Sequence, residues 1–260
     1  EGENPHVAIA SSVAERVALT ARRGTRYVVA VDEYRVGSVE LLASLLDTLA
    51  NRVAELNREA AGRANATISM LITTSDAIVA EARHIVGLKV EWALIWNLSR
   101  QAAGELVEQL ELQRRLGEEL RVTPEDAGEL LWRLAGGNPR ALKSIWRHSL
   151  TWWVREEVLD ATRRLAERLG RDVFLKHLER LASGPDELSY TPELWQAALR
   201  DNIAIRVSGS IRVTELPREP WVGGEYAYQI PAYYYALRAA ARKGALEVEP
   251  GDVVREALRD

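Results

Sequence analysis

Residues 26–35 read RYVVAVDEYR, and this stretch decides how the first part of the chain is interpreted. Residues 27–31 form a continuous, largely β-branched apolar run, which is typical of a strand buried on both faces of a parallel sheet. The run ends abruptly in two acids, Asp32 and Glu33. The pattern therefore predicts a buried strand with two carboxylates at its carboxyl end.

The flanking segments complete a strand–helix–strand unit. Apolar spacing predicts one helix over 8–23 and a long amphipathic helix over 38–60, with Ser38 as its N-cap. Residues 67–74, TISMLITT, repeat the buried-strand pattern and lead into Ser75 and Asp76. Open α/β sheets bind ligands at the carboxyl ends of their strands, so we expect the polar residues of both strand ends to lie together there.

The chain becomes helical from residue 99. We expect helices over 99–116, 124–135, 139–154 with continuation to 169, and 172–182, and a linker at residues 184–186. Beyond the linker, the pattern predicts a helix over 191–200, strands over 203–207, 211–216 and 226–230 with a turn at Gly209, and a helix over 231–243. This last segment is compatible with a winged-helix domain and equally with a small α+β cap.

Composition excludes several classes of site. The 260 residues carry 34 Lys and Arg against 38 Asp and Glu, a net charge of −4, and the apolar fraction of 47% is that of an ordinary globular protein. The absence of cysteine excludes disulfides, thiolate metal sites and cysteine nucleophiles. The four histidines are too dispersed to predict a zinc site: His6, His84, His148 and His177.

The sequence also bears on the cellular location and the source of the protein. It has no apolar run of the roughly 18–20 residues that a membrane span needs, and its acidic amino terminus lacks the basic region of a signal peptide. We therefore expect a cytoplasmic protein. Only 4 of the 34 basic residues are Lys, which with the single Met is compatible with a high-GC or thermophilic source.

Adjacent acids after a buried strand suit ATP hydrolysis. In P-loop ATPases the Asp of this pair holds Mg²⁺, usually through water, and the Glu polarises the attacking water. Two solvated acids at an ordinary strand end would give the same pattern. The strand and its two acids alone do not decide between these two interpretations.

Four motifs in order narrow the choice: VVAVDE (28–33), ITTSDA (72–77), WNLSRQAAGELVEQL (96–110) and LAGGNPRAL (134–142). Their order and spacing resemble the archaeal STAND-type branch of AAA+ ATPases. The resemblance implies a partial α/β P-loop NTPase-like core over 1–98, an all-α lid over 99–184 and a winged-helix-like domain over 185–260. It also implies a molecular switch with ATP and Mg²⁺ as cofactors.

The resemblance assigns roles to individual residues. Asp32 matches the Mg²⁺ ligand, Glu33 the catalytic base, and Thr74 or Ser75 the sensor 1 residue that contacts the water or the γ-phosphate. In the lid, Pro139 matches the turn that approaches the nucleotide, and Arg140 is the candidate sensor 2 arginine. The last assignment is an arginine finger acting across a subunit interface, for which the candidate is Arg83.

The sequence departs from this family at one essential motif. No GxxxxGK[ST] phosphate-binding loop occurs, and no Lys precedes Lys89. Without that loop, the two acids have little to act on, so the chain as written is expected to hydrolyse ATP poorly. We expect the loop to lie upstream of this chain. The alternatives are a non-enzymatic interaction module on a degenerate ATPase fold and a DNA-associated ATPase of the replication-initiator kind.

The charge distribution and the aromatic residues bear on the possible binding partners. Residues 185–245 carry seven basic and seven acidic residues, which does not favour DNA binding by the winged-helix-like region, whereas residues 140–182 carry ten against six. A homo-oligomer or a protein partner also fits the family. A group of aromatic residues could stack bases or could simply pack in the core: Trp152, Trp153, Trp195, Trp221 and Tyr233–Tyr235.

Overall fold

The computed structural model describes residues 5–34, 38–208, 211–213 and 216–259. The protein is mostly helical, and its described strands form sheets of only two strands each. The chain divides into two compact units, the first ending at Trp92 and the second beginning at Ala93. No described helix is long and apolar enough to cross a bilayer.

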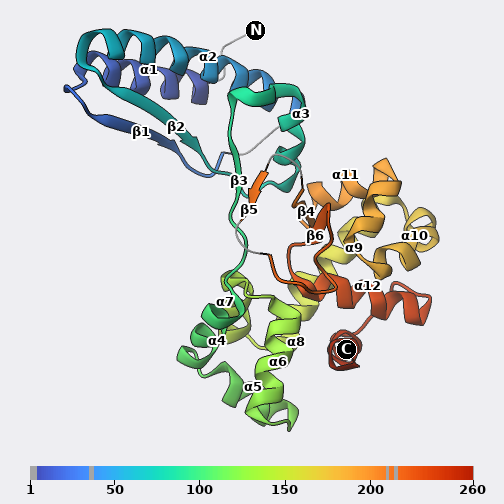
Figure 1. Cartoon of the computed structure of the whole chain (residues 1–260). Coiled ribbons are helices and arrows are strands. Elements are labelled where there is room, and N and C mark those ends of the chain that lie inside the picture. Colours follow the sequence, from blue (N-terminus) through green and yellow to red (C-terminus); the bar gives the residue numbers. More distant parts are fainter. Residues whose placement is uncertain (1–4, 35–37, 209–210, 214–215, 260) are drawn as a thin grey trace. The chain divides into compact units, whose positions relative to one another are not determined.

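The first unit contains the predicted strand–helix–strand pattern (Figure 1). Its elements are α1 (Pro5–Thr20), β1 (Arg26–Val31), α2 (Val39–Ala64), β2 (Thr67–Ile72), the 3₁₀ helix η1 (Ala77–Ala82), α3 (Arg83–Val86) and the 3₁₀ helix η2 (Gly87–Lys89). The predicted N-cap is confirmed, because the Ser38 hydroxyl accepts a hydrogen bond of 3.1 Å from the Leu41 amide. The strands pair in parallel and in register from Arg26↔Thr67 to Val31↔Ile72.

The core of this unit lies on one side of the two strands. Val29 and Ile68 point into it and pack with buried residues of α1 and α2, and Figure 1 shows both helices on the same side of the strands. On the other side, Val28 is 66% exposed and Leu71 is 53% exposed. The prediction that the first strand is buried on both faces is therefore wrong for the described residues. The predicted P-loop NTPase-like core is not shown by these two strands and their helices.

The second unit is built mainly of helices. Its elements begin with β3 (Trp92–Leu94), which straddles the boundary, and continue with α4 (Arg100–Gln109), α5 (Leu112–Leu120), α6 (Pro124–Ala135), α7 (Pro139–Arg147), α8 (Leu150–Trp153), the π-helix η3 (Val154–Leu159) and α9 (Asp160–Leu169). The remaining elements are α10 (Arg171–Ser183), the 3₁₀ helix η4 (Pro185–Tyr190), α11 (Pro192–Arg200), β4 (Ala204–Arg206), β5 (Ile211–Val213), β6 (Tyr226–Tyr228), α12 (Pro231–Lys243) and α13 (Pro250–Arg259).

Local signals placed several helices correctly. Thr123 caps α6 by accepting a hydrogen bond from the Asp126 amide, and both α6 and α12 have the predicted bounds. The predicted helix over 99–116 is instead two helices, because Glu111 adopts a left-handed backbone (φ 52°) between α4 and α5. Similarly, the helix expected from 139 onward breaks at His148 before α8 and η3.

The segments predicted as a lid and as a winged-helix-like domain share this unit. Helix α12 is largely buried and packs against α6, α10 and α13, so it draws together residues from both sides of the predicted linker. The expected winged sheet does not form among the described residues, since β4 pairs with β6 in antiparallel fashion while β5 pairs with β3. The predicted turn at Gly209 and the end of the predicted strand at 214–215 lie outside the described residues.

Candidate functional site

The carboxyl ends of β1 and β2 bring Asp32 and Thr73 together. Because Val31 and Ile72 are register partners, the next residue of each strand faces the other across the sheet. The Thr73 hydroxyl donates a hydrogen bond to the Asp32 carboxylate and accepts one of 3.2 Å from the Glu33 amide. One threonine hydroxyl thus contacts the carboxylate of Asp32 and the backbone of Glu33.

Glu33 occupies a conformation that is uncommon for a residue with a side chain. Its φ is 55°, in the left-handed region, where a Cβ costs roughly 1–2 kcal/mol. The backbone is held there from both sides, because the Tyr34 amide also bonds the Thr73 carbonyl at 2.9 Å. Tyr34 is buried, whereas Asp32 and Glu33 are exposed. Backbone strain is found at functional positions, but Glu111, another exposed acid, has the same backbone conformation at a helix junction.

The two sensor 1 candidates lie beside this contact without making it. The Thr74 hydroxyl accepts a hydrogen bond of 3.1 Å from the Asp76 amide, which shapes the turn after β2, and Ser75 is exposed. Sequence reasoning therefore missed Thr73. The sequence shows that Thr73 follows the second strand, but the register that places it opposite Asp32 comes from the structure.

Arg83 does not suit the predicted arginine finger. Arg83 is only 8% exposed, and its Nε lies 3.4 Å from Nε2 of His84 within the first unit. A finger that acts on a neighbouring subunit has to extend from the surface. The assignment was based on sequence position alone, and burial of this residue argues against it.

The GGNP turn lies in the second unit and serves as a junction of three segments. Leu98 donates its amide to the Gly137 carbonyl at 3.0 Å, and the Asn138 side chain bonds that of Asn97 at 3.0 Å. The Asn97 amide group in turn donates to the Gln229 carbonyl at 2.9 Å. The third and fourth motifs are therefore in direct contact, through two residues that are 41 positions apart in the chain.

Pro139 and Arg140 follow this junction in the first turn of α7, and both are exposed. Burial raises the pKa of Tyr233 to about 12, Glu157 raises it as well, and Arg164 and Arg140 act in the opposite direction. Arg140 therefore lies within electrostatic reach of Tyr233. Since both predicted lid residues belong to the second unit, their assignment to the site at Asp32 stays a prediction.

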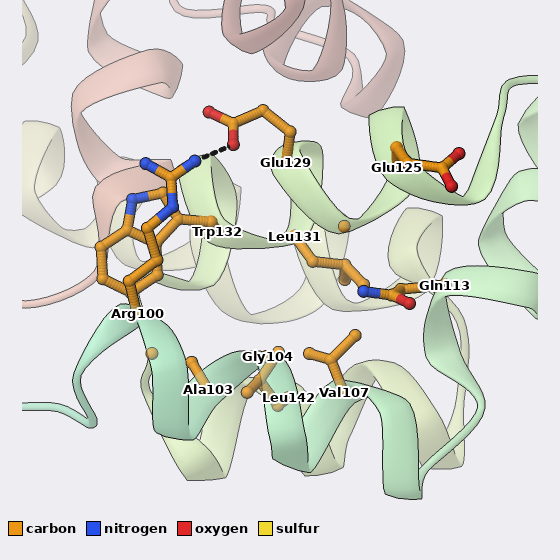
Figure 2. Close-up of a pocket in the computed structure, with 12 residues that line it drawn as sticks. Arg100, Ala103, Gly104, Val107, Gln113, Glu125, Glu129, Leu131, Trp132 and Leu142 are labelled. Carbon is orange, nitrogen blue, oxygen red and sulfur yellow. Dashed lines mark hydrogen bonds and ion pairs between the residues drawn. The ribbon is translucent and has the colours of Figure 1, made fainter.

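A small hollow of about 230 Å³ lies between α4 and α6. Figure 2 shows the Arg100 guanidinium over the ring of Trp132, 5.6 Å from its centroid, and joined to Glu129 by an ion pair. The Trp132 indole N–H donates a hydrogen bond of 2.9 Å to the Glu219 carboxylate. Ligand sites usually enclose about 300–1,000 Å³, so this hollow is too small for a nucleotide.

The predicted Mg²⁺ ligand lies at the end of β1. Mg²⁺ is usually held by one or two carboxylates together with water and substrate phosphates. The Asp32 carboxylate is exposed and accepts a hydrogen bond from Thr73, and its assignment to Mg²⁺ stays a prediction. Among the described residues, no group of three or more His, Cys, Asp or Glu forms an all-protein metal cage.

Comparison with known proteins gives no family for this chain. A scan against protein-family models, a search of curated proteins and a search of solved structures each found no match.

Proposed function

We propose that this chain contributes the acid-bearing edge of a Mg–ATP-dependent molecular switch. The observation that carries the proposal is the contact of Asp32, Glu33 and Thr73 at the ends of two parallel strands in register. Two acids and a hydroxyl at such an edge match the needs of phosphoryl chemistry, which are a cation ligand and a group that positions water.

Each of the three residues has a distinct part in this proposal. Asp32 would hold Mg²⁺, whose charge would offset that of the phosphates when it is bound. Glu33 would orient and polarise a water molecule from its position directly after the strand. The Thr73 hydroxyl bonds the Asp32 carboxylate and the Glu33 backbone amide, so Thr73 is a positioning residue.

The GGNP junction supports the switch part of the proposal. Its hydrogen bonds link the start of α4, the start of α7 and the start of α12. A displacement at Pro139 or Arg140 would therefore be transmitted to all three helices. A shift of this turn would displace the starts of three helices of the second unit together. Coupled helix shifts are one known form of switching.

The missing phosphate-binding loop favours a second candidate function. No GxxxxGK[ST] occurs in these residues, and the outer face of β1 and β2 exposes Val28 and Leu71. Both features are expected of an interaction module that kept part of an ATPase fold. Under this candidate, Asp32 and Glu33 are solvated acids at a strand end.

Mg–ATP turnover and binding separate the two candidates. We would measure both with the longest polypeptide that the gene encodes, with this 260-residue chain, and with Glu33→Gln in each. The ATPase proposal expects Glu33→Gln to bind Mg–ATP with unchanged affinity and to lose turnover. If the longest product neither binds nor hydrolyses ATP, the proposal fails and the interaction module is favoured.

A further inference from the structure

The stretch from Pro139 to Arg155 carries an unbalanced positive charge. It contains four basic residues and no acidic residue, while the protein as a whole has a net charge of −4. Lys143, Arg147 and Arg155 are all exposed, and within the part of the chain that the structure describes none of them forms an ion pair. Arg114 of the same unit, by contrast, is paired with Glu111 and Glu118.

Two exposed tryptophans lie among these charges. Trp146 is 41% exposed and follows Lys143 by three residues on α7, and Trp152 on α8 is 40% exposed. The other six tryptophans are buried or half-buried. An exposed large aromatic residue is informative where it is not scattered singly, and the two exposed tryptophans fall within seven residues of each other.

One of the rings has a stacking partner, and two of the charges lie on one helix face. His148 stacks on one face of Trp152, with ring centroids 4.0 Å apart and planes inclined by 30°. Lys143 and Arg147 are four residues apart on α7 and so share one face of that helix. We call Lys143, Trp146, Arg147, His148, Trp152 and Arg155 the basic aromatic surface.

We propose that the basic aromatic surface binds single-stranded nucleic acid. Unpaired cationic side chains attract a phosphate backbone, and exposed rings offer a stacking platform to bases that are not already paired. An anionic membrane fits less well, because an interfacial helix needs a free apolar face. In α7 that face is buried within the unit, as Ala141, Leu142 and Ile145.

This surface is independent of the proposed nucleotide site. Arg140 is left out of it, since the nucleotide proposal uses that residue. The surface would bind nucleic acid whether or not ATP is hydrolysed. The binding test can therefore fail while the ATPase proposal stands, and the ATPase proposal can fail while the binding test succeeds.

The test is fluorescence anisotropy of a labelled oligothymidine of about 20 nucleotides, longer than the roughly 4–16 nucleotides of common single-strand sites. The full chain is titrated at several salt concentrations between about 50 and 200 mM. Lys143→Glu/Arg147→Glu is expected to weaken binding by about tenfold or more and to make the salt slope shallower by about 1.4, at ~0.7 for each phosphate that is no longer neutralised. Trp152→Leu is expected to weaken binding by about tenfold with an unchanged slope.

A matched control comes from α10, where Lys176 and Arg180 are also exposed and four residues apart, with the second in the last helical turn. Lys176→Glu/Arg180→Glu should keep the affinity of the unchanged protein, and circular dichroism should show that all variants are folded. The proposal is overturned if the control variant loses as much affinity as the α7 variant. It is also overturned if the unchanged protein fails to bind the oligonucleotide at about 50 mM salt, binds a duplex of equal length as tightly, or binds only vesicles rich in phosphatidylserine.

Discussion

Replacing Gly137 with Ala tests whether the GGNP turn is a structural junction. Gly137 has a φ of 75°, and a Cβ placed on it would lie 2.3 Å from the Leu98 carbonyl oxygen and 3.3 Å from the Trp132 ring. Leu98 cannot move away easily, because its backbone N–H is hydrogen-bonded to the Gly137 carbonyl. The added methyl group must therefore distort backbone on both sides of the junction.

The cost can be estimated from two contributions. A left-handed backbone with a Cβ costs about 1–2 kcal/mol. Forcing a methyl group into a close-packed position costs a further ~1–3 kcal/mol. The free energy of unfolding of the second unit should therefore fall by about 2–5 kcal/mol, which lowers Tm by roughly 4–20 °C for a unit of this size.

The assay is thermal and urea unfolding followed by circular dichroism, with Gly244→Ala as the control. Gly244 follows α12 with a φ of 61° and would have no atom within 4 Å of a Cβ, so it carries the backbone cost alone. Gly137→Ala should destabilise the protein by at least about 1 kcal/mol more than the control. An equal loss in the two variants would refute the argument that the turn is closed against Leu98.

Three further predictions concern single side chains. Thr73→Val keeps the shape of the residue but removes the hydroxyl that orients Asp32, so Mg²⁺-dependent ATP binding by the longest gene product should weaken about fivefold by calorimetry; unchanged affinity would remove Thr73 from the site. Glu33→Gly should raise the free energy of unfolding by up to about 1 kcal/mol in urea titration, because relief of the left-handed strain exceeds the entropy that glycine adds to the unfolded chain; a loss of stability would contradict this. Burial disfavours the charged form of Asp186, but the amides of residues 224–226 donate to its carboxylate and hold its pKa below the ordinary value. Its contribution to stability is therefore complete above the unfolded pKa of about 3.8 and is lost as the pH falls through the lower folded pKa; in acid titrations followed by circular dichroism, Asp186→Asn should flatten this decline, and an unaltered acid limb would show that other carboxylates cause it.

Features with a local cause were predictable from the sequence. Thr123 and Pro124 begin α6, and Gly136 ends it in a left-handed conformation, since these residues act within one helical turn of their own position. The same holds for the start of α2 at Ser38 and for the adjacency of β1 and β2, which follows from a short strand–helix–strand connection. Asp32 and Glu33 were placed correctly at a strand end for this reason.

Features that depend on distant partners were not predictable from one sequence. The apolar run of β1 indicates a strand, but the number of its faces that are covered depends on which helices pack against it, and α1 and α2 both take the same face. Likewise, Arg83 has no local signal for burial. The strand pattern at 211–213 cannot specify its partner, which is β3 from far upstream.

The sequence by itself determined where α6 and α12 begin and end and which acids follow the first strand, because capping, periodicity and turn chemistry are short-range effects. Only the tertiary structure decided that Thr73 meets Asp32, that the Asn97 and Asn138 side chains join two motifs, and that Trp152 is exposed while Trp153 is buried. These outcomes depend on strand register and on the packing of helices that are far apart in the chain. Contacts of that kind are set by the free energy of the whole fold, and no single window of residues contains it.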